Sequence, residues 1–213
     1  HYAATRLRAR QPEGAPVSRA GPAPRSRLTR LLHAAIALAI IAQLIGIGFA
    51  ELPRPGLPGN LAFSAHQVVG LGTLSVLAVF WIWTLLRRRE HGFTALMPWF
   101  SRGRRAAVWA DLREHVAVLR RLRLPESGRE TPLASAVHGL GLVIATTMAA
   151  TGAIVFAGMA PDGALPAWAD AALSVHKAAA NLMWAYLIGH PAVALLHEAI
   201  GHRLLRGMTP GLR

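Results

Sequence analysis

The chain has 213 residues, of which 53% are hydrophobic and only 15% are charged, and its mean hydropathy is +0.36. This composition is too apolar for an ordinary soluble domain and is typical of a small membrane protein with several spans. The sequence contains no cysteine, which excludes disulfides, cysteine-ligated zinc, iron–sulfur clusters and covalently attached c-type haem. The formal net charge of +13 does not indicate nucleic-acid binding, because the arginines lie between apolar stretches and not on one basic face.

Residues 1–27 are rich in Pro, Arg, Ala and Gly and show no hydrophobic period. A segment of this composition buries too little apolar surface to fold alone, so a disordered basic tail is predicted. The remaining domain is predicted to extend over residues 28–210.

Four apolar stretches in that domain are long enough to cross a bilayer, and they cover residues 28–49, 61–86, 132–156 and 171–205. Prolines follow the first stretch, and Arg87 to Arg89 end the second. Pro191 lies within the fourth and is expected to bend it. No strand pattern is visible, so the predicted fold is all-α, an integral membrane four-helix bundle.

The distribution of arginine and lysine predicts the orientation of the bundle. Seven basic residues precede the first span or begin it, eleven lie between Arg87 and Glu130, and three lie at the C-terminal end. The two other connections contain only Arg54. By the positive-inside rule, both termini and the long middle segment are cytoplasmic. We therefore expect a multi-pass protein of the bacterial inner (cytoplasmic) membrane.

The middle segment contains a second kind of helical pattern, from Ala106 to Leu124. Its apolar residues recur at helical spacing with arginines between them, as at Trp109, Leu112 and Val116. This pattern predicts a cytoplasmic amphipathic helix between the second and third spans, lying on the membrane surface. The alternative is a helix that docks a soluble partner.

Four histidines lie inside the spans: His33 in the first, His66 in the second, and His176 and His190 in the fourth. Fourteen residues advance a helix by about 21 Å and return it to within about 40° of its starting direction. His176 and His190 therefore point the same way at different depths of a hydrocarbon core about 30 Å thick. The predicted orientation places His66 at the depth of His176, on the outer side, and His33 at the depth of His190, on the cytoplasmic side.

Two histidines on opposed helices can fill both axial positions of a haem iron. The alternatives are interhelical hydrogen bonds, for any single histidine, and a metal transporter, which would need carboxylates or sulfur ligands that the spans almost lack. Glycines in the spans would let helices approach a flat macrocycle, although small residues also serve ordinary helix packing; they are Gly46, Gly48, Gly70, Gly72, Gly139, Gly141 and Gly152.

Several segments resemble the prokaryotic cytochrome b561 family, which includes the cytochrome b subunits of nickel–iron hydrogenases and related formate dehydrogenase gamma subunits. They are RLLHAAIAL around His33, SAHQVVGLG around His66, VHKAAANLMWAYLIGHPAVALLH with His176, His190 and His197, and the terminal RLLRGMTPGL. The likeness covers about residues 28–210. It implies two haems b, one on His66 and His176 and one on His33 and His190. The longer middle segment and the basic tail depart from the family pattern.

Further candidates are weaker. His138 and His197 lie at the cytoplasmic side and are candidates for contacting a haem propionate or a quinone. Arg30 and Arg206 are candidates for pairing with propionates, because a guanidinium suits carboxylates. His202 and Arg203 are expected to anchor the interface, and His91 and His115 to be solvated.

Three functions agree with these features. The first is the cytochrome b subunit of a larger redox complex that exchanges electrons with quinone, which the tail and the middle segment favour. The second is a stand-alone quinol-oxidising cytochrome. The third is a non-catalytic accessory subunit of a bioenergetic supercomplex. The partners expected with the first are the lipid bilayer, quinone and other protein subunits.

Overall fold

The computed structural model describes residues 26–87, 93–121 and 131–199. Within these residues every named element is an α-helix or a 3₁₀ helix, and four of the α-helices are long and apolar enough to span a membrane. They are α1 (Arg27–Gly46, continued by a 3₁₀ turn Ile47–Phe49), α2 (Leu61–Leu86), α5 (Pro132–Gly158) and α6 (Ala167–Ala199). The predicted all-helical membrane bundle is confirmed.

The bounds of the spans agree closely with the predicted ones, except at the start of the fourth. α6 begins at Ala167, four residues before the predicted 171. Asp170 lies in its first turn, where a negative charge is favourable beside the exposed amides of a helix start. Pro191 lies inside α6 as expected. Residues 200–205 of the predicted span are outside the described residues, as is nearly all of the predicted tail 1–27.

Polar side chains begin three of the spanning helices. Ser26 Oγ accepts from Thr29 N, Thr131 Oγ1 accepts from Ala134 N, and Asn60 Oδ1 accepts from Phe63 N. Each bond satisfies an amide that the first helical turn leaves without an intrahelical partner. Asn60 also donates to the carbonyl of Phe49 at 2.9 Å, which joins the end of the first helix to the start of the second.

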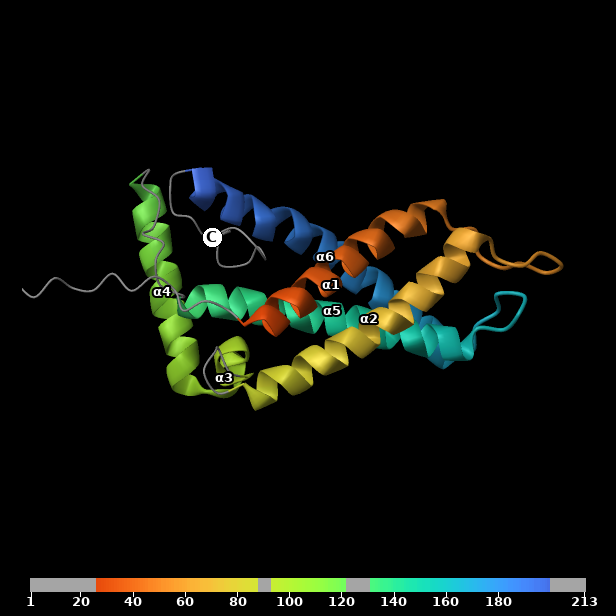
Figure 1. Ribbon diagram of the computed structural model, residues 1–213, viewed down its shortest axis with the longest axis horizontal. Helices are drawn as coiled ribbons and strands as arrows, with labels where there is room; N and C mark the ends of the chain where they lie inside the picture. The colour runs from red at the N-terminus through yellow and green to blue at the C-terminus, as the bar shows by residue number, and fades with distance from the viewer. Residues whose placement is uncertain (1–25, 88–92, 122–130, 200–213) are drawn as a thin grey trace, which may run out of the picture.

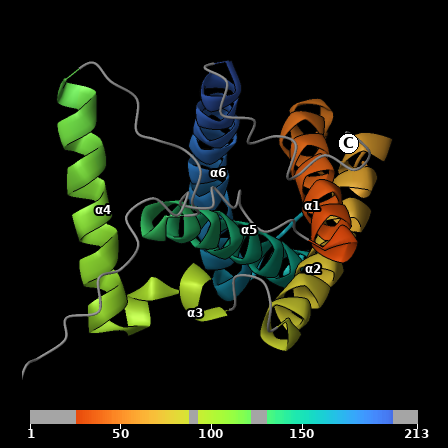
Figure 2. The same cartoon turned by 60° about the vertical axis from the view of Figure 1, so that its left-hand side comes forward.

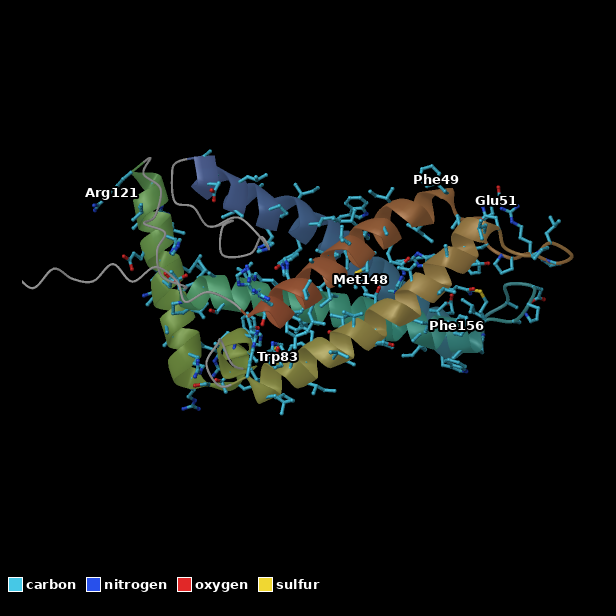
Figure 3. The ribbon with its side chains drawn as sticks, in the orientation of Figure 1. Phe49, Glu51, Trp83, Arg121, Met148 and Phe156 are labelled. Atoms are coloured by element: carbon cyan, nitrogen blue, oxygen red, sulfur yellow. The ribbon has the colours of Figure 1, made fainter. Side chains whose placement is uncertain are left out.

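The spans run along the long axis of the molecule, with α1 beside α2 and α5 packed against both α2 and α6 (Figures 1 and 2). All four contribute to one core halfway along the bundle, where Met148 lies (Figure 3). The buried members of this core are Ile36, Leu44, Leu77, Phe80, Ile144, Ala145, Met148, Ala179 and Met183. Outward-facing apolar residues such as Leu38 and Ile188 are 69% and 67% exposed, as expected of surfaces that contact lipid.

Two short elements and one longer helix lie at one end of the bundle. They are α3 (Phe93–Leu96), a 3₁₀ turn (Pro98–Phe100) and the longer α4 (Arg102–Arg120). α4 lies crosswise to the long axis of the bundle (Figure 1). It confirms the amphipathic helix predicted for 106–124, beginning four residues earlier, while the residues after 121 are outside the described part. α3 was not predicted. It packs on α5 at Gly139, where an added Cβ would collide with the Leu96 carbonyl.

The connections at the opposite end also touch one another. Gly163, between α5 and α6, has φ +84°, and an added Cβ there would meet the carbonyl oxygen of Pro53 between α1 and α2. Glycine alone adopts that φ without strain. The arginine-bearing α4 and the ends of the described chain at Ser26 and Ala199 lie together at the other end (Figure 1). The two ends therefore differ in charge, as the predicted orientation requires.

Candidate functional site

His66 of α2 and His176 of α6 face each other near the end of the bundle that carries the two short connections. Their ring centres are 6.3 Å apart and the ring planes are inclined by 84°. These two residues are more than 100 positions apart in the sequence, so their meeting depends on the packing of α2 and α6 around α5. The structure thus brings together the pair that the depth argument matched on the outer side.

The ring of His176 is oriented by the backbone of α5. Its Nδ1 lies 2.8 Å from the carbonyl oxygen of Met148 and 3.4 Å from the hydroxyl oxygen of Thr151. A carbonyl can only accept, so Nδ1 carries the proton and Nε2 keeps its lone pair. This is the arrangement found when a histidine binds a metal through Nε2 and is held by a hydrogen bond from Nδ1.

His66 is held through its backbone. The side-chain amide of Gln43 on α1 donates to the His66 carbonyl at 2.8 Å, in a space kept open by Gly70. The Nδ1 atom of His66 is buried and has no hydrogen-bond partner among the described residues. A buried polar atom left without a partner costs about 1–3 kcal/mol, which favours a bonding partner for this ring that is not part of the chain.

The spacing of this pair fits an iron held between the two rings. With about 2 Å from iron to each nitrogen and a little over 1 Å from nitrogen to ring centre, the two centres lie about 6 Å apart. Perpendicular ring planes can both contain the line through the iron. Beside the pair, a Cβ built on Gly152 of α5 would lie 3.2 Å from Cε1 of His176. The donors present therefore suit a bis-histidine haem.

We expect Gly152→Leu to abolish cofactor binding at this pair, because the added side chain must displace the His176 ring from the line to His66. Overpacking of this kind costs about 1–3 kcal/mol, and displacement of a ligand removes the site. The measurement is haem per protein in the purified chain. Gly103→Leu is the control, since Gly103 lies in α4 outside the spans and nothing lies within 4 Å of a Cβ there. Equal haem content in the two variants would contradict the expectation.

At the end that carries α4, His190 of α6 contacts two aromatic rings. Tyr186 stacks on it with ring centres 5.1 Å apart and planes inclined by 8°, and His138 of α5 meets it edge-on, also at 5.1 Å. Tyr186 in turn fills the space that Gly141 leaves on α5. The separation of 5.1 Å is short for two imidazoles that share one iron, so His138 and His190 are in contact with each other in this arrangement.

His33 lies in the second turn of α1, at the same end of the bundle as His190, and its side chain is exposed at the surface of the chain. The structure brings His138 into ring contact with His190. Tyr186 was not identified from the sequence as a site residue, although it precedes His190 by four positions and so shares its helix face. Gln43 was not identified either, because nothing local in the sequence links Gln43 to a residue of another span.

The other predicted residues are placed as follows. Arg30 is half-buried on α1. His197 lies in α6, but its side chain is not described, and Arg206, His202, Arg203 and His91 fall outside the described residues. His115 was predicted to be solvated and is instead half-buried, with Nδ1 3.1 Å from Oδ1 of Asp111. The cause is that α4 lies against α5.

Among the described residues, no three His, Asp or Glu side chains are grouped so that they could hold a metal ion by themselves. Among the same residues, the facing pair His66 and His176 suits a metal whose other positions a macrocycle would supply.

Comparison with known proteins agrees with this chemistry. A family model described as prokaryotic cytochrome b561 matches residues 25–211, which include all four spans and every histidine discussed as a ligand. Neither curated proteins nor solved structures gave a match. The resemblance inferred from the sequence segments is thus confirmed over nearly the whole chain. The chain belongs to the prokaryotic cytochrome b561 family, and it is a multi-pass membrane protein of haem-b electron transport.

Proposed function

We propose that the protein carries electrons across a bacterial cytoplasmic membrane through two bis-histidine b haems, as the cytochrome b subunit of a larger redox complex that exchanges electrons with quinone. His66 and His176 ligate the outer haem, and His33 and His190 ligate the inner one. The observation that carries this proposal is the facing pair His66 and His176, 6.3 Å apart at one end of the bundle.

At the outer site the chain supplies ligation and orientation. The imidazoles of His66 and His176 would hold the haem iron, and the carbonyl of Met148 keeps the His176 ring oriented through Nδ1. With two histidines holding it, the haem would supply a one-electron redox centre and not an oxygen-binding site.

At the inner site Tyr186 holds the orientation of the His190 ring by stacking on it. We assign the opposite ligand to His33 and not to His138, because 5.1 Å between the rings of His138 and His190 is too short for a shared iron.

The remaining polar side chains at this end suit the edge of the inner haem or a quinone. Arg30 and Arg206 are assigned to propionates, which a guanidinium binds through paired hydrogen bonds. His138 and His197 are assigned to a propionate or a quinone carbonyl, to which an imidazole N–H donates. The membership of a larger complex rests on the basic tail and the long middle segment of the sequence.

The test is the haem content and reducibility of the purified full chain in lipid nanodiscs. We expect two b haems per chain by pyridine haemochrome assay, both reduced by a short-chain quinol. One haem or none per chain, from cells that supply haem, would overturn the two-site assignment. Two haems that dithionite reduces and quinol does not would overturn the quinone assignment alone.

The orientation can be tested with single cysteines, because the native chain has none. Leu57→Cys lies between α1 and α2 at a residue that is 65% exposed, and Arg104→Cys lies at an exposed position of α4. A membrane-impermeant maleimide added to intact spheroplasts is expected to label Leu57→Cys, and to label Arg104→Cys only after permeabilisation. The reverse pattern would show that the bundle is inserted the other way.

A further inference from the structure

α4 is anchored to the bundle by the side chain of Asp111. Asp111 Oδ2 accepts a hydrogen bond of 2.8 Å from the backbone N–H of Leu133, in the first turn of α5. A carboxylate at a helix start is stabilised both by the free amides and by the helix dipole. The bond ties the middle of α4 to a spanning helix, so α4 is held at the level where the spans leave the bilayer.

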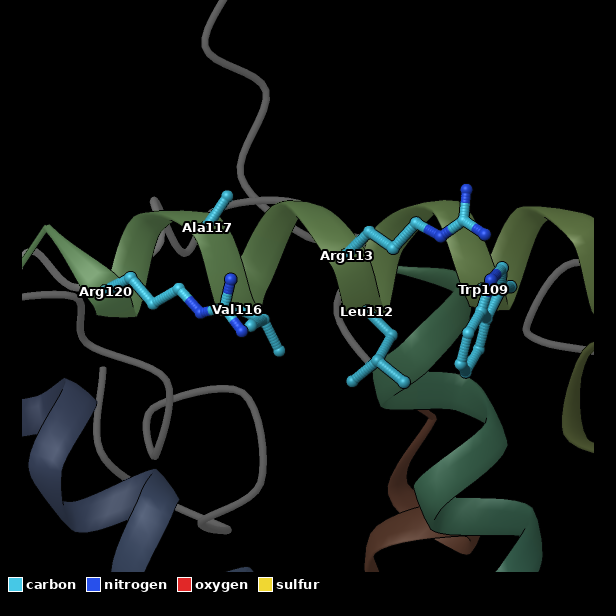
Figure 4. Close-up of a pocket in the computed structure, with 6 residues that line it drawn as sticks. All are labelled: Trp109, Leu112, Arg113, Val116, Ala117 and Arg120. Carbon is cyan, nitrogen blue, oxygen red and sulfur yellow. The ribbon is translucent and has the colours of Figure 1, made fainter.

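A groove runs along the side of α4. Its volume is about 400 Å³, and it is lined by Trp109, Leu112, Arg113, Val116, Ala117 and Arg120. These positions recur at helical spacing, so they form one face. Trp109, Leu112 and Val116 lie on the side of α4 toward α5 (Figure 4). Trp109 and Val116 are nevertheless 56% and 39% exposed, so the described part of the chain covers this apolar face incompletely.

The groove is also positively charged. The guanidinium of Arg113 lies 5.4 Å from the centre of the Trp109 ring, a position that a cation–π interaction stabilises. The Arg120 side chain runs back along α4 toward Val116 (Figure 4). Two guanidinium groups thus flank an apolar wall. The two acidic residues of this helix, Asp111 and Glu114, do not line the groove, and Asp111 is engaged by α5.

An apolar wall flanked by cations at the membrane surface matches one class of molecule. We propose that the groove binds one anionic phospholipid of the adjoining leaflet. One acyl chain lies along Trp109, Leu112 and Val116, and the phosphate is held by Arg113 and Arg120. A helix parallel to the bilayer with aromatic and aliphatic residues on its inner side suits this contact. The inference concerns α4 alone and does not depend on the assignment of the haem ligands.

The test is native mass spectrometry of the full chain, delipidated in detergent and titrated with dioleoyl-phosphatidylglycerol or with dioleoyl-phosphatidylcholine. We expect phosphatidylglycerol to bind at one site at least tenfold more tightly. Each arginine near an anionic lipid strengthens attraction by about fivefold, so Arg113→Gln with Arg120→Gln is expected to weaken binding by about 25-fold. Trp109→Ala is expected to weaken the binding of both lipids, because it removes part of the apolar wall.

The matched control is Arg102→Gln with Arg104→Gln, which removes the same charge from α4 outside the groove and is expected to change binding less than twofold. Circular dichroism and gel filtration verify that each variant is folded. The inference is overturned if the two double variants lose the same affinity for phosphatidylglycerol, because the loss then comes from the net charge of α4 and not from the groove. Displacement of phosphatidylglycerol by millimolar inorganic phosphate would show a simple anion site instead. Equal binding of both lipids would favour a protein partner for this face.

Discussion

Replacing His176 with Ala is expected to lower the haem content from two to one per chain. In the proposed assignment His176 supplies Nε2 to the outer haem, and no other imidazole among the described residues lies in ring contact with His66. A one-ligand b haem is lost during purification because the remaining bond is not supported by its opposite partner. The pyridine haemochrome assay measures the loss, and His66→Ala is expected to give the same result. Electron transfer across proteoliposomes is expected to stop in both variants.

Thr151→Val is the matched control for this result. Its hydroxyl lies 3.4 Å from Nδ1 of His176, while the shorter bond of that nitrogen is to the Met148 carbonyl, which the substitution leaves in place. We therefore expect Thr151→Val to keep two haems. Two haems in His176→Ala would refute ligation by His176, and loss of a haem in Thr151→Val would show that the hydroxyl itself is needed.

The second large effect is expected at the inner site, where three histidines must be distinguished. His33→Ala and His190→Ala are each expected to lose one haem, since both are assigned as ligands. His138→Ala is expected to keep both haems. The His138→Ala substitution removes one hydrogen-bond donor to a propionate or quinone, which weakens quinol binding by about tenfold, or about 1.4 kcal/mol. Haem content and the quinol concentration that gives half-maximal reduction are the two measurements.

The structure makes this comparison informative because it places the ring of His138 against that of His190. If His138→Ala loses a haem and His33→Ala keeps both, His138 is the ligand and the assignment taken from the family segment is wrong. Tyr186→Phe serves as the control for local packing. It keeps the ring that stacks on His190 and removes only the hydroxyl, so both haems are expected to remain.

The sequence by itself determined the four spans and the amphipathic helix. Runs of apolar residues of this length have few alternatives, because a membrane leaves the backbone no partners except those of its own helix. The meeting of His66 with His176 was also foreseeable, because the direction of each span assigns a depth to each residue and equal depths bring side chains to one level.

Depth does not determine which face of a helix meets which neighbour, and this is what only the tertiary structure decided. Four contacts depend on how each helix is rotated and how closely it approaches its neighbour. They are the packing of α3 on Gly139, the stacking of Tyr186 on His190, the edge contact of His138 with His190, and the hydrogen bond from Leu133 to Asp111. Those follow from packing between segments far apart in the chain. A single sequence holds no local pattern for such contacts, so the outer pair was predictable and the surroundings of His190 were not.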